Sequence, residues 1–352
     1  MNQINNLFEN KNILIVGGAG FVGSNLTKLI LNTNNLVNIT VIDNLLSSEK
    51  FNLPVDIRLN FIEGSITEDK ILAKLEDNLD YIFHLATYHG NQSSIANPLA
   101  DHENNTLTTL KLFERIKYFK NLKKVVYSSA GCSVAKKTFN EAVETTEDSA
   151  IEIIQDSPYS ISKIFGEFYS VYYFRQHKLQ TVRARFQNVY GPGEVLGAGK
   201  WRGTPATVWR NVIPTFIYKA LNNYPLPVEN SGIATRDFIF VEDICIGLIL
   251  CACKGNAGDV YNLGSGKETT ILELALLINN VTKNKSAIEC LPKRNWDNSG
   301  KRFASTVKSE SELSFKALIN IEEGLEKTIL WTKNNIDIIN QTIYKHKDML
   351  KV

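Results

Sequence analysis

Short apolar segments alternate with longer amphipathic stretches along the first half of the chain. The apolar segments lie at residues 13–16, 39–42, 81–85, 124–128 and 180–185. Continuous apolar runs of this length are typical of parallel strands buried on both faces, and the stretches between them have helix-like patterns. The alternation therefore predicts an α/β protein built on a parallel sheet.

The pattern becomes less regular after the sequence GPGE at 191–194. A stretch rich in glycine and tryptophan, GAGKWRGTPATVWR at 197–210, predicts a loop that leads into a helix. Two later segments, DFIFV at 237–241 and DVYNL at 259–263, predict a return to the sheet. We expect two interleaved parts: a sheet domain of residues 11–190 plus about 237–263, and a smaller C-terminal lobe of residues 191–236 plus 264–352 that faces the substrate.

A glycine-rich turn follows the first predicted strand. Gly17, Gly20 and Gly23 form GxxGxxG, in which a missing Cβ lets backbone N–H groups approach a pyrophosphate and lets the next helix lie close to the strand. Asp43 stands twenty residues beyond Gly23, where its carboxylate can accept both ribose hydroxyl protons of an adenosine. These features predict a Rossmann-type, doubly wound sheet that binds a dinucleotide. The alternative is a helix packed on a strand with no ligand.

The choice of dinucleotide follows from charge. The carboxylate of Asp43 would repel a 2′-phosphate, and residues 44–48 (NLLSS) contain no arginine to bind one. We therefore expect NAD as the cofactor, not NADP.

Composition excludes several other partners. The 352 residues include 39 basic and 37 acidic side chains, a formal net charge of +2, which gives no reason to expect nucleic acid or an anionic membrane as a partner. No apolar run approaches about 18 residues, and the first residues lack the basic segment and apolar core of a secretory signal. We expect a soluble, cytoplasmic protein.

The cysteines do not suggest a metal site. Their number is odd, their spacing does not resemble a zinc site, and the five histidines do not stand beside them in ligand patterns. We expect buried thiols and no metal. The five are Cys132, Cys245, Cys251, Cys253 and Cys290.

Tyr159 and Lys163 stand four residues apart in SPYSISKIFGE, at the start of a predicted helix whose entry is marked by Ser157 and Pro158. Both side chains would lie on one helix face. A nearby ammonium group stabilises a phenolate, so we expect the pKa of Tyr159 to fall from about 10 and the residue to act as a base. Lys163 can also bind a nicotinamide ribose. The alternative is an ordinary surface pair, but its order after the dinucleotide motif argues against that.

In this order, the motifs resemble the extended short-chain dehydrogenase/reductase family, in particular its nucleotide-sugar epimerase and dehydratase branch. The resemblance covers nearly the whole chain and implies NAD, a nucleotide-sugar substrate, and a homodimer formed by helices near 100–118 and 159–176. The further matching blocks are HLAT at 84–87, VVYSS at 125–129, RFQNVYGPG at 185–193, RDFIFVED at 236–243, YNLGSGK at 261–267 and EEGLEKTILWTK at 322–333.

The resemblance also implies a set of contacts. Ser65 stands where many relatives carry an aspartate that accepts from the adenine amino group, and a hydroxyl can still accept that bond. The implied cofactor contacts are Gly17, Gly20, Phe21, Val22, Gly23, Asp43, Asn44, Ser65, Ile66, Leu85, Ala86, Thr87, Ser128, Tyr159, Lys163 and Val189. The implied substrate contacts are His89, Ser94, Asn188, Val212, Arg236 and Arg302.

Two of the implied substrate contacts leave alternatives open. Arg236 and Arg302 suit a diphosphate because a guanidinium fork matches phosphate oxygens, although Arg236 could instead form a salt bridge with the adjacent acidic segment. His89 lies in TYHGNQSS at 87–94, which suggests a polar sugar pocket. It could bind the substrate, shuttle a proton, or be a solvated loop histidine.

Departures from the family pattern bear on the reaction. An ungapped alignment puts Ala130 where relatives carry the Ser or Thr that binds the reacting hydroxyl, and we expect Ser129 to take this role as a third catalytic residue. Cys132 or neither residue is the alternative. Dehydratases need an acidic pair next, but Gly131 and Cys132 stand here, so dehydration is disfavoured. By position Cys132 resembles the cysteine acid/base of a sugar 3,5-epimerase, although we favour a buried thiol.

These features predict an NAD-dependent oxidation at C4 of a nucleotide-activated sugar. We expect a 4-dehydrogenase, because the chain resembles the GDP-heptose 4-dehydrogenases of bacterial surface-polysaccharide pathways. The alternative is a 4-epimerase that oxidises C4 only transiently. A 4,6-dehydratase and a non-enzymatic NAD-binding regulator are the remaining alternatives, and the presence of both Tyr159 and Lys163 argues against the regulator.

Overall fold

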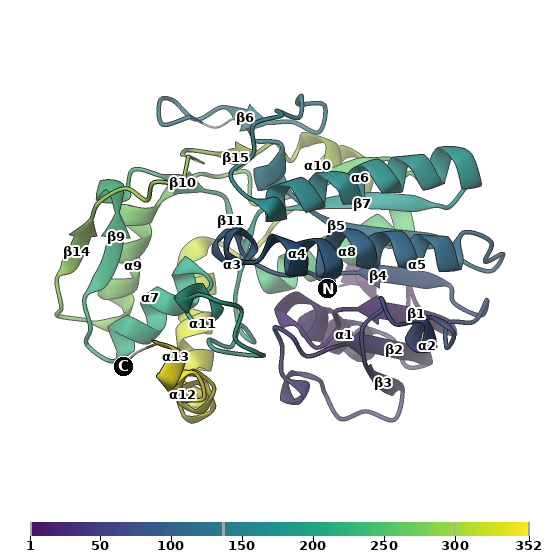
Figure 1. Cartoon of the computed structure of the whole chain (residues 1–352), viewed down its shortest axis with the longest axis horizontal. Coiled ribbons are helices and arrows are strands. Elements are labelled where there is room, and N and C mark those ends of the chain that lie inside the picture. The colour runs from purple at the N-terminus through teal and green to yellow at the C-terminus, as the bar shows by residue number, and fades with distance from the viewer. Residues whose placement is uncertain (1, 136–137, 299, 351–352) are drawn as a thin grey trace.

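A seven-stranded parallel sheet runs through the computed structural model, which describes residues 2–135, 138–298 and 300–350. The strand order is β12-β7-β5-β4-β1-β2-β3 (Figure 1). Because the order reverses between β1 and β4, a crevice forms at the carboxyl ends of these strands. The strands are β1 (Lys11–Val16), β2 (Val37–Asp43), β3 (Leu59–Glu63), β4 (Tyr81–His84), β5 (Lys124–Ala130), β7 (Thr181–Phe186) and β12 (Val260–Leu263).

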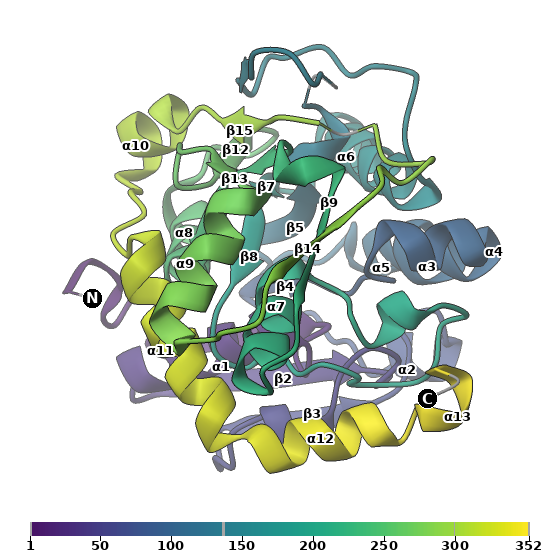
Figure 2. The same cartoon turned by 90° about the vertical axis from the view of Figure 1, so that its left-hand side faces the viewer.

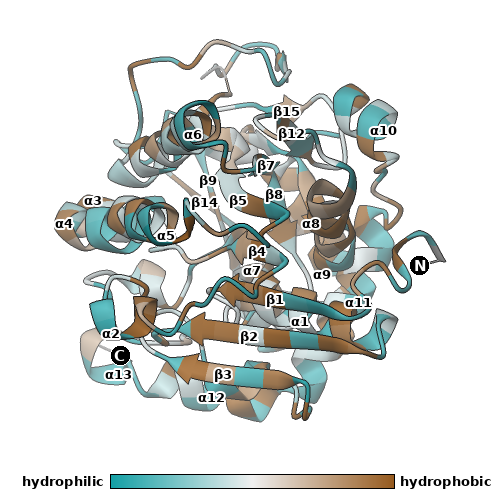
Figure 3. Cartoon of the chain, turned by 90° about the vertical axis from the view of Figure 1, so that its right-hand side faces the viewer, coloured by the Kyte–Doolittle hydropathy of each residue, from teal (hydrophilic) through white to brown (hydrophobic). Residues whose placement is uncertain are grey.

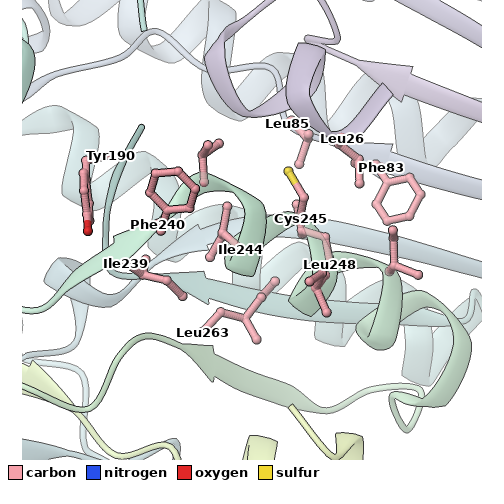
Figure 4. Close-up of a cluster of buried hydrophobic side chains, with 14 of the residues drawn as sticks. Leu26, Phe83, Leu85, Tyr190, Ile239, Phe240, Ile244, Cys245, Leu248 and Leu263 are labelled. Carbon is pink, nitrogen blue, oxygen red and sulfur yellow. The ribbon is translucent and has the colours of Figure 1, made fainter. Parts of the chain in front are cut away.

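Helices cover both faces of this sheet. One face packs against α1 (Phe21–Thr33) and α8 (Val241–Lys254), and the other against α2 (Asp69–Leu72), α5 (Thr108–Ile116) and α6 (Pro158–His177). The strands β1 and β2 and the helix α8 are mostly hydrophobic (Figure 3). Figure 4 shows Cys245 of α8 among Leu26, Phe83, Leu85 and Leu248, all of them buried. Burial on both faces explains why the strands are continuous apolar runs.

A second, smaller lobe lies beyond the carboxyl ends of the strands (Figure 2). Its main elements are α7 (Val212–Leu221), β9 (Leu226–Glu229), α9 (Ile271–Thr282), β14 (Ile288–Leu291), α11 (Ile321–Asn334) and α12 (Ile336–Tyr344). The shorter helices are α3 (Asn91–Ala96), α4 (Pro98–Asp101), the π-helical turn η3 (His102–Leu107), α10 (Val307–Leu313) and α13 (Lys347–Leu350). The shorter strands are β6 (Glu144–Thr145), β8 (Asn188–Tyr190), β10 (Thr235–Arg236), β11 (Phe238–Phe240), β13 (Thr269–Thr270) and β15 (Phe303–Ala304). Single 3₁₀ turns lie at Asn2–Ile4, Lys50–Asn52, Gly131–Ser133, Pro205–Thr207 and Asn230–Gly232.

The predicted α/β class and doubly wound sheet are confirmed, with two differences in detail. The strand β3 has no counterpart in the predicted set, because its alternating sequence LNFIE belongs to a half-exposed edge strand, not to a buried apolar run. The predicted return of 237–241 to the sheet is wrong. That segment forms β11, which pairs with β8 in a separate two-stranded sheet, and only β12 rejoins the central sheet.

Among the described residues, the search for a helix of sufficient length and apolar character to cross a bilayer finds none.

Candidate active site

A cavity of about 750 Å³ lies where the carboxyl ends of the strands face the smaller lobe. Every residue expected to bind the cofactor lines it, as do Ser129 and all the expected substrate contacts except Ser94. The structure thus brings together residues that the chain separates by more than two hundred positions.

Ser94 is the expected substrate contact that the structure contradicts. It is fully buried, its hydroxyl donates to the carbonyl of Asn91, and it accepts a hydrogen bond from the backbone N–H of Tyr159. The residue therefore helps to fix the start of α6 and does not reach the cavity.

The glycine turn is shaped as a diphosphate site. Gly17 has a φ of +84°, and a Cβ there would lie 2.5 Å from the backbone nitrogen of Ala86, so only glycine fits. Gly20 is the N-cap of α1, and no side chain caps this helix. Its first backbone N–H groups are therefore available to an anion at the positive end of the helix dipole.

Asp43 closes the same end of the cavity. It is the last residue of β2 and accepts hydrogen bonds from the backbone N–H of Ala19 at 2.9 Å and from the hydroxyl of Ser48 at 2.8 Å. Burial raises the pKa of this carboxyl, while these hydrogen bonds favour its charged form. Ser65 and Ile66 line the cavity nearby. The donor set fits NAD, with the diphosphate at the start of α1 and the adenosine ribose at Asp43.

Tyr159 and Lys163 face the cavity from the first turns of α6. Ser157 caps this helix by accepting a hydrogen bond from the backbone N–H of Ser160, and Pro158 occupies the first turn, as the sequence predicts. The ammonium group of Lys163 donates to the carbonyl oxygen of Ser128 at 2.9 Å and lies 5.8 Å from the centre of the Tyr159 ring. The predicted placement of both side chains on one face is seen.

The expected lowering of the Tyr159 pKa is wrong for the protein alone. Burial raises the pKa of this phenol, Cys132 and Asp101 add to the rise, and a hydrogen bond with Thr87 opposes it. Burial also lowers the pKa of Lys163 to about 8. Desolvation is thus the largest influence on both groups, because burial disfavours the charged form of each.

The residues at the end of β5 and just after it depart from the expected roles. The hydroxyl of Ser129 donates to the carboxylate of Glu167 at 2.5 Å, and Glu167 pairs with Arg185. This buried network occupies the hydroxyl, so the geometry does not favour Ser129 as the residue that binds the reacting hydroxyl. Ala130 offers none. Cys132 lines the cavity and is partly exposed, so its interpretation as a buried thiol is wrong.

The other cysteines differ in how buried they are. Cys245 and Cys251 are buried in α8 as expected, and Cys290 is exposed. Among the residues that the structure describes, no group of three His, Cys, Asp or Glu side chains could hold a metal ion.

His89 packs against Tyr159. Its ring centre lies 6.2 Å from that of Tyr159 in an edge-on arrangement. Burial, together with the smaller effects of the charges of Arg210, Arg202 and Lys163, lowers the pKa of His89 to about 3. The interpretation as a solvated loop histidine is therefore wrong, and the ring stays neutral at working pH.

Two arginines define the opposite end of the cavity. Arg236 and Arg302 both line it with Asn188 and Val212, and burial, followed by the charge of Arg302, lowers the pKa of Arg236 to about 9. One guanidinium nitrogen of Arg236 donates to the carbonyl of Gly300 at 2.7 Å. Two close cations in a partly buried wall suit an anionic group such as a diphosphate.

The sequence analysis predicted a loop at 197–210 but named no site residue in the segment of residues 194–211, which we call the strap. Glu194 and Arg210 of the strap line the cavity, and burial raises the pKa of Glu194 to about 7. Asn211 donates to Glu194, and Arg210 donates to the carbonyl of Ser47 at 2.8 Å. The length of this stretch and its two arginines were the available signal, but nothing local places them at the cavity.

Comparisons with known proteins give the context. The sequence profile of the NAD dependent epimerase/dehydratase family matches residues 13–264. The crystal structure of the Bordetella bronchiseptica enzyme WbmF in complex with NAD+ and UDP is 60% identical, covers 98% of both chains and superposes with a TM-score of 0.88. The same enzyme is also known in complex with NADH.

Two curated relatives are more distant. A putative UDP-glucose 4-epimerase of Methanocaldococcus jannaschii is 28% identical, with 92% of this chain and 99% of that protein covered. A dTDP-D-glucose 4,6-dehydratase of Dictyostelium discoideum is 27% identical, with 95% of this chain and 84% of that protein covered.

Proposed function

This chain belongs to the NAD-dependent epimerase/dehydratase family, and we propose that it is an NAD-dependent 4-epimerase of a UDP-linked sugar that oxidises C4 transiently. The observation that carries the proposal is a single cavity. Tyr159 and Lys163 line it together with the glycine turn, whose shape suits a dinucleotide, and with Arg236 and Arg302, whose charge suits a diphosphate.

Bound NAD supplies the hydride acceptor, and the protein supplies position and proton transfer. Tyr159 takes the proton of the reacting hydroxyl, and Lys163 stabilises the resulting phenolate and binds the nicotinamide ribose. The hydrogen bond from the ammonium group of Lys163 to the carbonyl oxygen of Ser128 keeps this group beside the tyrosine. Arg236 and Arg302 bind the diphosphate of the nucleotide, so the sugar lies against Tyr159.

Several observations support C4 and UDP. Both curated relatives are named for reactions at C4. The relative with 60% identity was crystallised with UDP, which favours a UDP-linked substrate over the GDP-heptose expected from the sequence. Dehydration lacks its acid and base, because Gly131 and Cys132 stand where the acidic pair would be.

A 4-dehydrogenase is the second candidate. Ala130 has no hydroxyl and that of Ser129 is held by Glu167, so the site lacks the usual Ser or Thr contact to the reacting oxygen. A different geometry at C4 could release the keto sugar before hydride returns. The cofactor would then have to leave as NADH.

The deciding experiment incubates the purified enzyme with UDP-hexoses, UDP-N-acetylhexosamines and their C6 acids, and follows products by NMR and mass. An isomer without net NADH establishes the epimerase, whereas loss of two mass units with stoichiometric NADH establishes the dehydrogenase. Tyr159→Phe should abolish turnover but keep UDP binding. Tyr224→Phe, an exposed tyrosine of the smaller lobe, is the matched control. Loss of water would contradict the proposal.

We also propose that the enzyme is a homodimer. One face of α6 carries a row of exposed apolar side chains at helical spacing, namely Ile161, Phe165, Phe168 and Tyr172, with exposed fractions from 42% to 54%. Leu99 and Ile95, which precede η3, are also exposed. An apolar stripe of this kind suits a bundle with the same helices of a second copy.

A further inference from the structure

The loop that follows β4 brings a hydroxyl group beside the position that Ala130 leaves without one. The strands β4 and β5 pair in parallel, and the last pair joins His84 and Tyr127. Thr87 and Ala130 each follow three residues after this pair, and both line the cavity. Because neighbouring strands lie about 4.8 Å apart, the chain leaves both strands at nearly the same place. Thr87 thus stands at the edge of the sheet where Ala130 has no hydroxyl to offer.

The hydroxyl of Thr87 contacts the proposed base. Burial raises the pKa of Tyr159, and a hydrogen bond with Thr87 opposes that rise. A buried phenolate has lost the water that would solvate it, so a hydroxyl that donates to it replaces one of the lost hydrogen bonds. Thr87 therefore favours the charged form that a base needs.

Asn105 holds this hydroxyl in place. The residue is 4% exposed, and its amide oxygen accepts from the hydroxyl of Thr87 at 3.0 Å and from the backbone N–H of Tyr88 at 2.7 Å. Its amide nitrogen donates to the carboxylate of Asp101 at 2.7 Å and to the hydroxyl of Ser162 at 3.2 Å. The amide cannot turn over without placing its oxygen against that carboxylate. The side chain of Thr87 is therefore anchored on a rigid support.

The single proton of the Thr87 hydroxyl has two acceptors within reach. In the resting protein it is donated to the amide oxygen of Asn105. When it turns to Tyr159 instead, the amide oxygen keeps the backbone N–H of Tyr88 and is not left unsatisfied. The turn is favourable once the tyrosine is charged, because a hydrogen bond to a charged acceptor is the stronger one.

We propose that Thr87 supplies the hydroxyl that Ala130 lacks, and that it donates to the oxygen of Tyr159 whenever this oxygen carries a negative charge. The inference rests on the proposed function of the same cavity, in which Tyr159 takes the proton of the reacting hydroxyl. As that proton arrives, the charge leaves the phenol oxygen and the proton of Thr87 returns to Asn105. Thr87 is thus a catalytic residue, because it touches an atom that takes part in the proton transfer.

Titratable groups face Tyr159 from its own helix and from four neighbouring segments. They are Lys163 on α6, His89 after β4, Tyr127 on β5, Cys132 after β5 and Asp101 on α4. Thr87→Val changes none of these groups, because the two side chains have the same shape and neither is charged. A change in the titration of Tyr159 in this variant therefore reports the lost hydroxyl.

The first test titrates Tyr159 by NMR in the NAD-loaded enzyme without a sugar. Isotope labelling of the ring carbon that bears the hydroxyl gives a signal for each of the 13 tyrosines, and Tyr159→Phe identifies the signal of interest by its absence. The midpoint should be about one pH unit higher in Thr87→Val than in wild type, and Thr87→Ser should return it to the wild-type value. Equal midpoints in wild type and Thr87→Val overturn the inference. A Tyr159 that stays neutral in wild type up to the ordinary value of about 10 overturns it as well.

The second test measures the rate at which bound NAD is reduced in single turnovers with a UDP-sugar. At a pH below the wild-type midpoint, Thr87→Val should react about tenfold more slowly, because one pKa unit changes the fraction of phenolate tenfold. Thr87→Ser should restore most of the rate. Thr40→Val, at a half-buried position of β2, is the matched control and should keep the wild-type rate. A slower rate in Thr87→Val that comes entirely from loss of bound NAD overturns the inference.

Failure of the two proposals can be told apart. If Thr87→Val shifts the midpoint of Tyr159 but no UDP-sugar reduces the bound NAD of wild type, the hydrogen bond stands and the proposed reaction fails. If Thr87→Val and wild type reduce NAD at the same rate, the reaction stands and the inference fails. The inference also fails if Ser129→Ala slows the reaction more than Thr87→Val does, because the hydroxyl would then come from Ser129.

Discussion

The ammonium group of Lys163 donates a 2.9 Å hydrogen bond to the carbonyl oxygen of Ser128. This bond joins the first turns of α6, which carry Tyr159, to the carboxyl end of β5. It fixes the distance between Tyr159 and this edge of the sheet. The same contact places Lys163 in a buried position, with a consequence for its titration.

The stability of the cofactor-free enzyme should depend on Lys163 at alkaline pH. Its folded pKa is about 8, below the ordinary value of 10.5, so between these values the unfolded chain binds more protons. The contribution of Lys163 therefore rises with pH from 8 to 10.5 and is lost as pH falls through 8. The free energy of unfolding should rise by about 2 to 3 kcal/mol across this window relative to Lys163→Met.

Urea unfolding at several pH values measures this difference. Parallel pH profiles for wild type and Lys163→Met would contradict the depressed pKa. The variant should also lose most of its turnover, since it cannot stabilise the phenolate.

His89 should not titrate in the working range. Its pKa is lowered to about 3 because burial and the nearby arginines disfavour the imidazolium. The pH profile of kcat between 5.5 and 7.5 should therefore have the same shape in wild type and in His89→Gln, which keeps a hydrogen-bond donor. Initial rates across this range test the expectation. A step near pH 6.5 that disappears in the variant would show a proton shuttle instead.

Ser129 should matter more for stability than for turnover. Its hydroxyl donates to the buried carboxylate of Glu167, and a hydrogen bond to a charged group contributes about 1.5 to 3 kcal/mol. Ser129→Ala should lower the free energy of unfolding by about this amount, while kcat falls less than about threefold. Denaturant titration and steady-state kinetics measure the two effects. A large loss of kcat with unchanged stability would show that Ser129 takes part in the reaction.

The sequence predicted the residues whose chemistry depends on local spacing. The glycine turn, Asp43 and the pair Tyr159 and Lys163 are each defined by a short motif, and all of them line the cavity. The local sequence pattern did not predict the properties that depend on burial. It did not show that desolvation raises the pKa of Tyr159, or that the hydroxyls of Ser94 and Ser129 are held by other protein groups.

The strap shows a different limit. Arg210 comes to the cavity because the strap packs on residues near Leu46 and on α12, where Thr342 donates to the carbonyl of Leu196. Those contacts join positions about 150 residues apart. No sequence pattern within the strap predicts these contacts. Its arginines therefore belong to no recognisable motif.

The apolar stripe on α6 should control association. Phe168 is 54% exposed, and an acidic side chain placed there would bring two like charges together in a bundle of α6 with its copy. Phe168→Asp should therefore be monomeric at concentrations where the wild type is a dimer, as measured by sedimentation velocity. Val55→Asp, at a fully exposed position far from this helix in sequence, should keep the wild-type mass. Because Phe168 points away from the cavity, a monomer that still binds UDP would separate assembly from substrate binding. A dimer that survives Phe168→Asp would exclude this face as the interface.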